Sequence, residues 1–352
     1  MFTSLGSALR AVPPDGEPLK VDAEIAVGSP AEAAGLAKKA EEFGFDCMWV
    51  NETKHDPFVQ LALACTATSE ILLGTSIALA FTRSPTTLAY TSWGLQSASK
   101  GRFILGLGSQ VKGHIERRFG MKWEPPAPKM KETALALRAV WESWQRGTPL
   151  DFRGGFYRLD LMTPFFSPGP IDHPAIPIYI AGVNPGMCRV AGMVADGLHV
   201  HPLHTVRYLR EVVLPALDEG AARANRESRA AVAASVFAAV GRTDKEIQDA
   251  KGVLRQQIAF YASTRSYRRV MDLHGWGDVC DRLHALSTKG AWDKMGEEVG
   301  REVLDKFVVE GTWEEIGSVL MKRYGGLVDR IRLYVPFDGA QDWQKFVRAF
   351  KS

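Results

Sequence analysis

Residues 71–110, ILLGTSIALAFTRSPTTLAYTSWGLQSASKGRFILGLGSQ, decide the fold because they hold two mostly apolar stretches on either side of a helix-length connection. The stretches, residues 71–80 and 102–108, have the composition of buried strands, and each ends in small or polar residues. Strands that are apolar on both faces are typical of parallel sheets covered by helices. In an α/β barrel, such strands present their chemistry at their carboxyl ends. The segment therefore predicts two successive parallel strands with a functional site where they end.

The same alternation of strand and helix continues on both sides of this segment. We expect further strands at residues 19–27, 45–50, 177–182, 196–202, 231–240 and 329–335. We expect helices at residues 31–43, 57–69, 84–99, 126–147, 185–195, 205–224, 312–324 and 340–350. Ser29–Glu32 has the pattern of a capping box, and Thr312 is the expected cap of the helix that follows it. Eight strands alternating with helices favour an α/β (β/α)8 TIM barrel, and an open doubly wound sheet is the alternative.

Two stretches interrupt the alternation, at residues 148–176 and 241–306. The first contains FRGGFYRLD (152–160), whose Gly-Gly between aromatic and apolar residues predicts a hairpin. The second is long, charged and mostly helical in pattern, and an insertion of that size usually forms a wall or lid of a site. The first eighteen residues are predicted to be an irregular arm. Residues 1–352 are expected to form a single barrel domain with these two insertions.

Composition limits the classes of partner. Lys and Arg together number 43 and Asp and Glu 40, which gives a net charge of +3. So small an excess gives no reason to expect nucleic acid or a membrane as partner. The four cysteines are scattered without C-x-x-C spacing, and buried thiols are the expected state. No signal-peptide pattern opens the chain and no apolar run reaches about eighteen residues, so we expect a cytoplasmic protein that acts on a small molecule.

Five blocks of sequence carry a resemblance to a known family: FDCMWVNETKHDPF (45–58), GTSIALAFTRSP (74–85), GRFILGLGSQ (101–110), PIYIAGVNPGMCRVAGMVADG (177–197) and FVVEGTWEEIGSVLMKRY (307–324). These blocks resemble the bacterial luciferase-like flavin and deazaflavin oxidoreductases. The sequences ETKHDPF and IALAFTRSP are more similar to those of the coenzyme F420-dependent branch than to luciferase itself. The resemblance implies a barrel that transfers a hydride between coenzyme F420 and a small organic substrate. It also implies a homodimer formed through the early helices.

The resemblance further implies where the cofactor binds. Family members have a non-prolyl cis peptide behind the cofactor ring, which falls here at Ser76–Ile77, and a phosphate loop after the fifth strand. That loop would offer free N–H groups at a helix start, where an anion is favoured. The glycines of GRFILGLGSQ could either let a flat ring lie against the strand end or make room for neighbouring side chains. The residues implied in cofactor binding are Ser76, Ile77, Gly108, Ser109, Gln110, Ala181, Gly182, Val183, Asn184, Gly186 and Met187.

Catalytic candidates follow the second strand. The resemblance implies an acid–base or ring-contacting group at His55, or at Glu52 nearby. Arg117 and Arg118 could pair with a phosphate or an acidic cofactor tail, or could be solvated charges. Candidate apolar walls are Trp49, Phe81 and Phe119, although core packing is the default for Trp49. Val111 stands where the sugar-phosphate dehydrogenase branch has a catalytic glutamate, so we expect a neutral or unsaturated compound that is reduced by hydride, or a secondary alcohol that is oxidised.

Three alternatives remain at this point. An FMN-dependent monooxygenase keeps the fold and changes the cofactor. His199-x-His201, with His204 close behind, could ligate a metal because alternate strand residues share a face, which would indicate a metal-dependent barrel hydrolase. No Asp/His pattern on other strands completes such a ligand set, so we expect no metal and expect His199 or His201 to line the pocket. A barrel that has lost catalysis and only binds ligands is the third alternative.

Overall fold

The computed structural model describes residues 18–352, so the predicted N-terminal arm lies almost wholly outside the described residues. Its centre is a closed sheet in which every strand pairing is parallel. The strands follow the order β3-β2-β1-β13-β10-β9-β8-β5-β4, and a β3–β5 pairing closes the cylinder. Their bounds are β1 Lys20–Ile25, β2 Cys47–Val50, β3 Leu72–Thr75, β4 Ala78–Leu79, β5 Phe103–Gly108, β8 Ile178–Gly182, β9 Gly197–Val200, β10 Ala231–Val236 and β13 Arg330–Leu333. Because β3 and β4 are two pieces of one interrupted strand, the predicted eight-stranded TIM barrel is confirmed.

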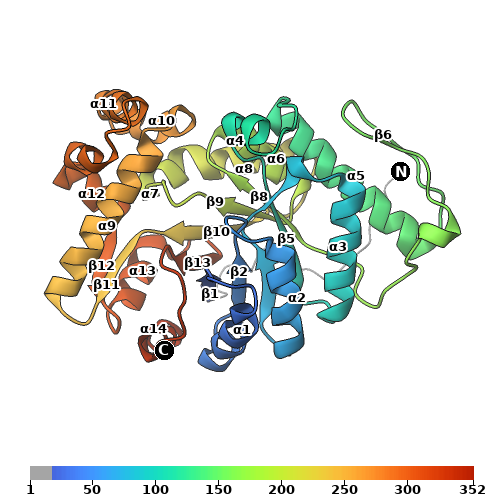
Figure 1. Ribbon diagram of the computed structural model, residues 1–352, viewed down its shortest axis with the longest axis horizontal. Coiled ribbons are helices and arrows are strands. Elements are labelled where there is room, and N and C mark those ends of the chain that lie inside the picture. Colours follow the sequence, from blue (N-terminus) through green and yellow to red (C-terminus); the bar gives the residue numbers. More distant parts are fainter. Residues whose placement is uncertain (1–17) are drawn as a thin grey trace.

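Helices surround the barrel close to the expected positions (Figure 1). Two begin at proline behind a side-chain cap: Asp56 accepts from Phe58 N–H before α2, and Ser84 accepts from Thr87 N–H before α3. The long helix expected at 205–224 contains a π-helical turn, η3. The bounds are α1 Glu32–Phe43, α2 Pro57–Ala67, η1 Ala80–Thr82, α3 Pro85–Ala98, α4 Lys112–Arg117, α5 Pro126–Arg146, α6 Pro185–Val194, α7 Val206–Tyr208, η3 Leu209–Val213, α8 Leu214–Arg223, α13 Ile316–Tyr324 and α14 Gln341–Lys351. None of the helices in residues 18–352 has the length and apolar character needed to span a bilayer.

Two predicted caps differ from the structure. At α1 only half of the capping box forms: Glu32 accepts from the N–H of Ser29, but Ala31 is the N-cap residue and makes no side-chain cap hydrogen bond. Thr312 does not cap a helix, because it ends a short strand, β12 Val309–Thr312. The turn that follows it is held by the Glu315 carboxylate, which accepts from the N–H and hydroxyl of Thr312.

The stretch 231–240 is not one strand. It breaks at Phe237 into β10 and a second strand, β11 Ala238–Gly241, which leaves the barrel and pairs in parallel with β12. The sequence does not indicate β12, because its residues, VEGT, are too few to show a period. This two-stranded sheet holds together the start and the end of the second insertion.

Both predicted insertions have the expected character. In the first, β6 Phe152–Arg153 and β7 Arg158–Leu159 form an antiparallel hairpin, followed by η2 Pro164–Phe166. Glu132 of α5 accepts hydrogen bonds from three N–H groups of the hairpin loop. The second insertion consists of α9 Asp244–Ala262, η4 Arg265–Tyr267, α10 Arg268–Asp272, α11 Gly277–Thr288, η5 Trp292–Glu298 and α12 Arg301–Phe307. Figure 1 shows α9 to α12 (orange) grouped on one side of the barrel, with β6 on the opposite side.

The inside of the barrel is polar and charged at its centre. Arg330 of β13 and Asp22 of β1 form a buried ion pair, with Nη2 to Oδ1 at 2.6 Å, and Trp49 Nε1 donates to Asp22 Oδ2 at 2.8 Å. Residues alternate along a strand, so Glu24 and Arg332 lie one level closer to the carboxyl ends. They form a second ion pair, from Arg332 Nε to Glu24 Oε2, at 2.6 Å. The core below the mouth is therefore held by two stacked ion pairs.

Candidate active site

The interruption between β3 and β4 lies at the mouth of the barrel. The Ser76–Ile77 peptide bond is cis, as the resemblance predicted, and that prediction is confirmed. Arg332 reaches across the mouth from β13, and its Nη2 donates to Ser76 Oγ at 2.6 Å. Asn51 Nδ2 donates to the other oxygen of Glu24 at 3.0 Å. The bulge is thus connected to strands β1, β2 and β13 by a chain of charge-assisted hydrogen bonds.

The glycines of β5 make room for neighbouring groups. A Cβ at Gly106 would lie 1.8 Å from the carbonyl oxygen of Thr75, and a Cβ at Gly108 would lie 2.6 Å from Ile77 Cδ1. The structure therefore supports the packing interpretation of these glycines over a flat ring lying on them. Beyond the strand, Gln110 adopts a left-handed conformation with φ 57°, and its side-chain oxygen accepts from the N–H of Val111. Ser109 beside it is half-buried.

Glu52 and His55 lie on the loop after β2, as expected, but both are engaged in hydrogen bonds. The Glu52 carboxylate receives two hydrogen bonds from Arg83 (2.7 and 2.9 Å) and one from the N–H of Leu79 (2.8 Å). Its own N–H donates to the carbonyl of Ile77. His55 Nε2 lies 3.0 Å from the carbonyl oxygen of Gly28. The geometry of Glu52 is that of a group positioning the bulge, and its predicted catalytic role and that of His55 stay predictions.

The predicted phosphate loop has the geometry of an anion site. Asn184 is the N-cap of α6, yet it makes no side-chain cap hydrogen bond, because its Nδ2 donates to the carbonyl of Ser266 at 2.8 Å. The N–H groups of Val183, Asn184 and Gly186 make no backbone hydrogen bond within residues 18–352. Nothing lies within 4 Å of where a Cβ of Gly186 would be. Ala181, Gly182 and Met187 complete the same turn.

Two arginines of the insertion border this loop, and the sequence did not indicate them. Beside Asn184 opens a cavity of about 720 Å³. Its lining is Asn184, Val212, Arg265, Ser266, Arg269, Asp272 and Leu273. Arg265 and Arg269 are both exposed. Uncapped N–H groups, a helix N-terminus and two cations next to one cavity favour a bound anion.

An aromatic group, which we call the mouth cluster, covers the ends of β9, β10 and β13. It consists of His201, Phe237, Tyr261, Tyr267 and Tyr334. The His201 ring stacks on Tyr267 with centroids 4.4 Å apart and meets Tyr261 edge-on at 4.6 Å. The hydroxyls of Tyr261 and Tyr334 are 2.6 Å apart. Sequence reasoning named only His201 here, because the tyrosines of the insertion carry no motif.

His199 lies deeper, inside the barrel. Its ring packs edge-on against Trp49 at 4.6 Å and near Tyr179, and burial keeps its pKa well below the ordinary value. Neither ring nitrogen has a hydrogen-bond partner within the described part of the chain. His204 turns away, with Nδ1 near the His201 carbonyl. Residues 18–352 contain no group of three His, Cys, Asp or Glu placed to hold one metal ion.

The aromatic residues predicted as walls of the site, and the two arginines predicted to bind an anion, do not lie together around one pocket. Trp49 is fully buried in the barrel, and Phe81 is buried beneath the ammonium of Lys129, so neither forms a wall of the mouth. Phe119 is half-buried under the guanidinium of Arg118. Arg118 itself donates to the carbonyl of Thr53, which ties α4 to the loop after β2. Arg117 is exposed and does not line the cavity beside Asn184.

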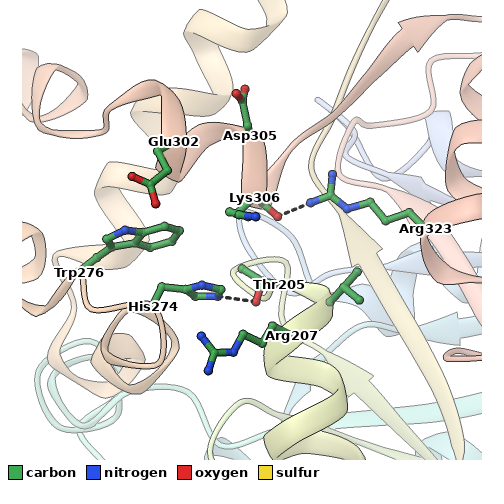
Figure 2. Close-up of a pocket in the computed structure, with 9 residues that line it drawn as sticks. Thr205, Arg207, His274, Trp276, Glu302, Asp305, Lys306 and Arg323 are labelled. Carbon is green, nitrogen blue, oxygen red and sulfur yellow. Dashed lines mark hydrogen bonds between the residues drawn. The ribbon is translucent and has the colours of Figure 1, made fainter.

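A second cavity, of about 570 Å³, lies between α7 and the insertion (Figure 2). His274 Nε2 is 2.8 Å from Thr205 Oγ1, and the His274 ring stacks on Trp276 at 4.5 Å. Figure 2 shows Glu302 of α12 above Trp276, with Lys306 of the same helix nearby and the carboxylate of Asp305 pointing away from the pair. Acids and bases are mixed around it, so its charge selects no ligand class, and none of the predicted site residues lines it.

Comparison with known proteins assigns the family. The family described as luciferase-like monooxygenase matches residues 13–330. An uncharacterised protein of Mycobacterium tuberculosis, Rv1360, is 46% identical over 314 residues, which cover 89% of this chain and 92% of that protein. Rv3520c of the same organism, named a putative coenzyme F420-dependent oxidoreductase, is 28% identical over 330 residues, covering 86% and 93%.

The fold also matches a solved structure. Coenzyme F420-dependent tetrahydromethanopterin reductase from Methanopyrus kandleri superposes with a TM-score of 0.77 at 21% identity, over 95% of this chain and 98% of that one. At that identity the match concerns the fold. The family match over most of the chain leads to one conclusion. This chain belongs to the luciferase-like monooxygenase family, and it is related in sequence to the coenzyme F420-dependent branch of that family.

Proposed function

We propose that this protein is an oxidoreductase that transfers a hydride between coenzyme F420 and a small neutral organic substrate. The observation that carries the proposal is the anion site at α6, where uncapped N–H groups stand beside Arg265 and Arg269 at the rim of the barrel. Coenzyme F420 is a deazaflavin with a phosphate and an acidic tail, so this site fits its charged end. The related protein Rv3520c, with its F420-dependent name, supports the same cofactor.

Other residues would hold the ring and exclude water. When bound, a deazaflavin supplies or accepts the hydride. The bulge at Ser76–Ile77, fixed by Arg332, would support one face of the ring, and Asn184 to Met187 would hold the phosphate. The mouth cluster would close the substrate side, since its aromatic rings keep bulk solvent away from the reacting atoms. Glu24 and Arg332 neutralise each other, so a neutral substrate suits this mouth.

Titration of the purified protein with coenzyme F420 and with FMN, followed by fluorescence quenching, tests the proposal. We expect saturable binding of F420 and weaker binding of FMN. The double variant Arg265→Gln/Arg269→Gln should weaken F420 binding by about tenfold or more, because two charge-assisted contacts are lost. Arg282→Gln is the matched control, because Arg282 lies in the same insertion and pairs with Glu298. Binding of FMN alone would instead favour the monooxygenase alternative.

We also propose a homodimer formed through the early helices. The outer surfaces of α2 and α3 leave Val59, Leu63 and Tyr90 exposed, which supports a protein contact there. Light scattering coupled to gel filtration gives the mass in solution, and Leu63→Glu should shift it toward the monomer. A monomeric parent protein would contradict this proposal.

A further inference from the structure

The imidazole of His201 has one N–H group, at Nε2, that donates to no other of the described residues of the site. The backbone N–H of Leu203 donates to His201 Nδ1 at 3.1 Å. A nitrogen that accepts a hydrogen bond carries no proton, so the proton of the neutral ring is on Nε2. Burial, with a smaller effect from His204, lowers the pKa of His201 to about 3. The ring is therefore neutral at physiological pH and presents an N–H at Nε2.

The Nε2–H group of His201 is open to solvent-accessible space at the carboxyl end of β9. No residue in 18–352 accepts a hydrogen bond from it, and it is not among the side-chain atoms sealed in the core without a partner, which include both nitrogens of His199. Strand alternation places His201 on the same face of β9 as His199, one level closer to the carboxyl end. The ring plane is fixed by stacking on Tyr267 and by the edge contact with Tyr261. The donor is thus pre-oriented before any substrate arrives.

The groups around His201 are neutral donors or paired charges. Tyr261 from α9 and Tyr334 after β13 share a hydrogen bond between their hydroxyls, which leaves one O–H proton free to donate. Burial raises the pKa of both tyrosines, and that of Tyr267, so all three stay protonated. Below them, Glu24 and Arg332 form an ion pair. His204 is buried, and its pKa is lowered to about 4, so it adds no charge.

We propose that His201 Nε2–H binds the oxygen of the substrate, and that the substrate is a neutral ketone or aldehyde, or the corresponding alcohol, with an apolar or aromatic group packed against Tyr261 and Tyr267. A donor aimed at one point within aromatic walls matches an oxygen on an otherwise apolar molecule. A sugar phosphate would bring a double negative charge to a cluster that has no unpaired cation among the described residues. This inference deepens the proposed function and rests on it.

The same geometry defines what His201 does in the reaction. On reduction, the hydride that a bound reduced deazaflavin would supply adds to the carbonyl carbon, the π electron pair moves onto oxygen, and a proton from a water molecule admitted to the mouth completes the alcohol. His201 donates a hydrogen bond to the developing negative charge and gives up no proton, as expected for a neutral imidazole. Loss of one such donor typically lowers kcat by about 10² to 10³-fold.

Nitrogen-15 NMR of the cofactor-free protein tests the protonation state of His201. The signals that disappear in His201→Gln belong to this residue among the eight histidines. We expect them to show the Nε2–H form without titration between pH 5 and 8. A proton on Nδ1, or a titration near the ordinary pKa of about 6.5, would overturn the inference.

Binding of acetophenone labelled with carbon-13 at the carbonyl tests the subsite, with oxidised F420 present. His201→Phe keeps a ring against Tyr267 but has no donor, and His201→Gln keeps a donor near the position of Nε2. We expect a downfield carbonyl shift on binding to the parent and to His201→Gln, and about tenfold weaker binding without that shift in His201→Phe. Equal affinity and equal shifts in all three proteins, or no binding by the parent, would overturn the inference.

The two proposals fail separately in this design. Quenching by F420 together with identical acetophenone signals in all variants would refute the role of His201 and leave the cofactor proposal standing. The expected histidine signals and carbonyl shift, measured without any quenching by F420, would refute the proposed cofactor and keep the oxygen subsite.

Discussion

Removing one partner of the ion pair inside the barrel should show which of the two charges the core can neutralise. The side chains of Asp22 and Arg330 are 1% and 10% exposed, and three hydrogen bonds converge on the carboxylate, two from Arg330 and one from Trp49. In Asp22→Leu the guanidinium is left without a partner and cannot lose its proton. A buried charge left this way typically costs about 3–5 kcal/mol of unfolding free energy. This loss should not change between pH 5 and 8.

Arg330→Met leaves the carboxylate of Asp22 without its partner, but this group can lose its charge by taking up a proton. Asp22 can take up a proton, and doing so at pH 7 from an ordinary pKa of about 3.9 costs about 4 kcal/mol at most. With its folded pKa raised, the carboxyl holds a proton in the folded state that the unfolded chain has released. The free energy of unfolding therefore falls as the pH rises from the ordinary pKa of Asp22 towards its raised pKa in the folded variant, by about 1.4 kcal/mol per pH unit. The loss in Arg330→Met should be smaller at pH 5 than at pH 7 by about 3 kcal/mol.

Urea unfolding followed by circular dichroism at pH 5, 6, 7 and 8 measures both effects. The double variant Asp22→Leu/Arg330→Met should lose less than either single variant, because only Trp49 Nε1–H is left unpaired, at about 1–3 kcal/mol. Arg153→Met, in an exposed pair on the hairpin, controls for the loss of any arginine and should give no measurable change. An equal, pH-independent loss in Arg330→Met and Asp22→Leu would refute the reasoning.

Three further predictions follow from the site. Gly106→Ala should lower the free energy of unfolding by about 3 kcal/mol or more, because its Cβ would lie 1.8 Å from the Thr75 carbonyl oxygen. Gly186→Ala has open space around it and should keep the parent's melting temperature. Similar thermal unfolding of both variants would be inconsistent with this packing. Glu52→Gln should lower the free energy of unfolding by about 1–2 kcal/mol, because Arg83 loses one of its two negative partners and keeps only Asp56. Unchanged stability with a large fall in kcat would favour the catalytic role of Glu52 instead. All four cysteines are buried, and burial raises the pKa of Cys188 to about 12 and that of Cys280 to about 11. A disulfide reagent at pH 8 should therefore label the thiols only after the protein unfolds. Fast labelling of the native protein would contradict this arrangement.

The barrel was predictable because its strands carry the pattern of burial on both faces. Residues 102–108 contain β5, in which all six residues of Phe103–Gly108 are buried, and the helices expected at 57–69 and 84–99 begin at Pro57 and Pro85. The interruption at Ser76–Ile77 came from the family resemblance alone, since the residues there look like continuous strand. β12 and the break at Phe237 were missed because short strands at an insertion have no periodicity to detect.

The candidate site was predictable only where it follows the barrel rim. Asn184 and Gly186 lie at a strand end and carry a turn-and-cap pattern, so the loop could be found from the sequence. Arg265, Tyr261 and Tyr267 reach the same rim from an insertion far away in the chain, and no local pattern links them to it. The glycines of β5 were ambiguous because a missing side chain does not say which neighbour fills the space.

The pairing of β11 with β12 gives the chain a natural exchange point. Gly241 and Thr312 are partners in register, so the chain leaves the barrel and returns to it at neighbouring positions. The residues between these two strands can therefore differ in length or sequence while the strands of the barrel keep their positions. The insertion carries Arg265 of the cavity beside Asn184 together with Tyr261 and Tyr267 of the mouth cluster. A change within it can therefore alter both binding regions while the barrel strands stay in place.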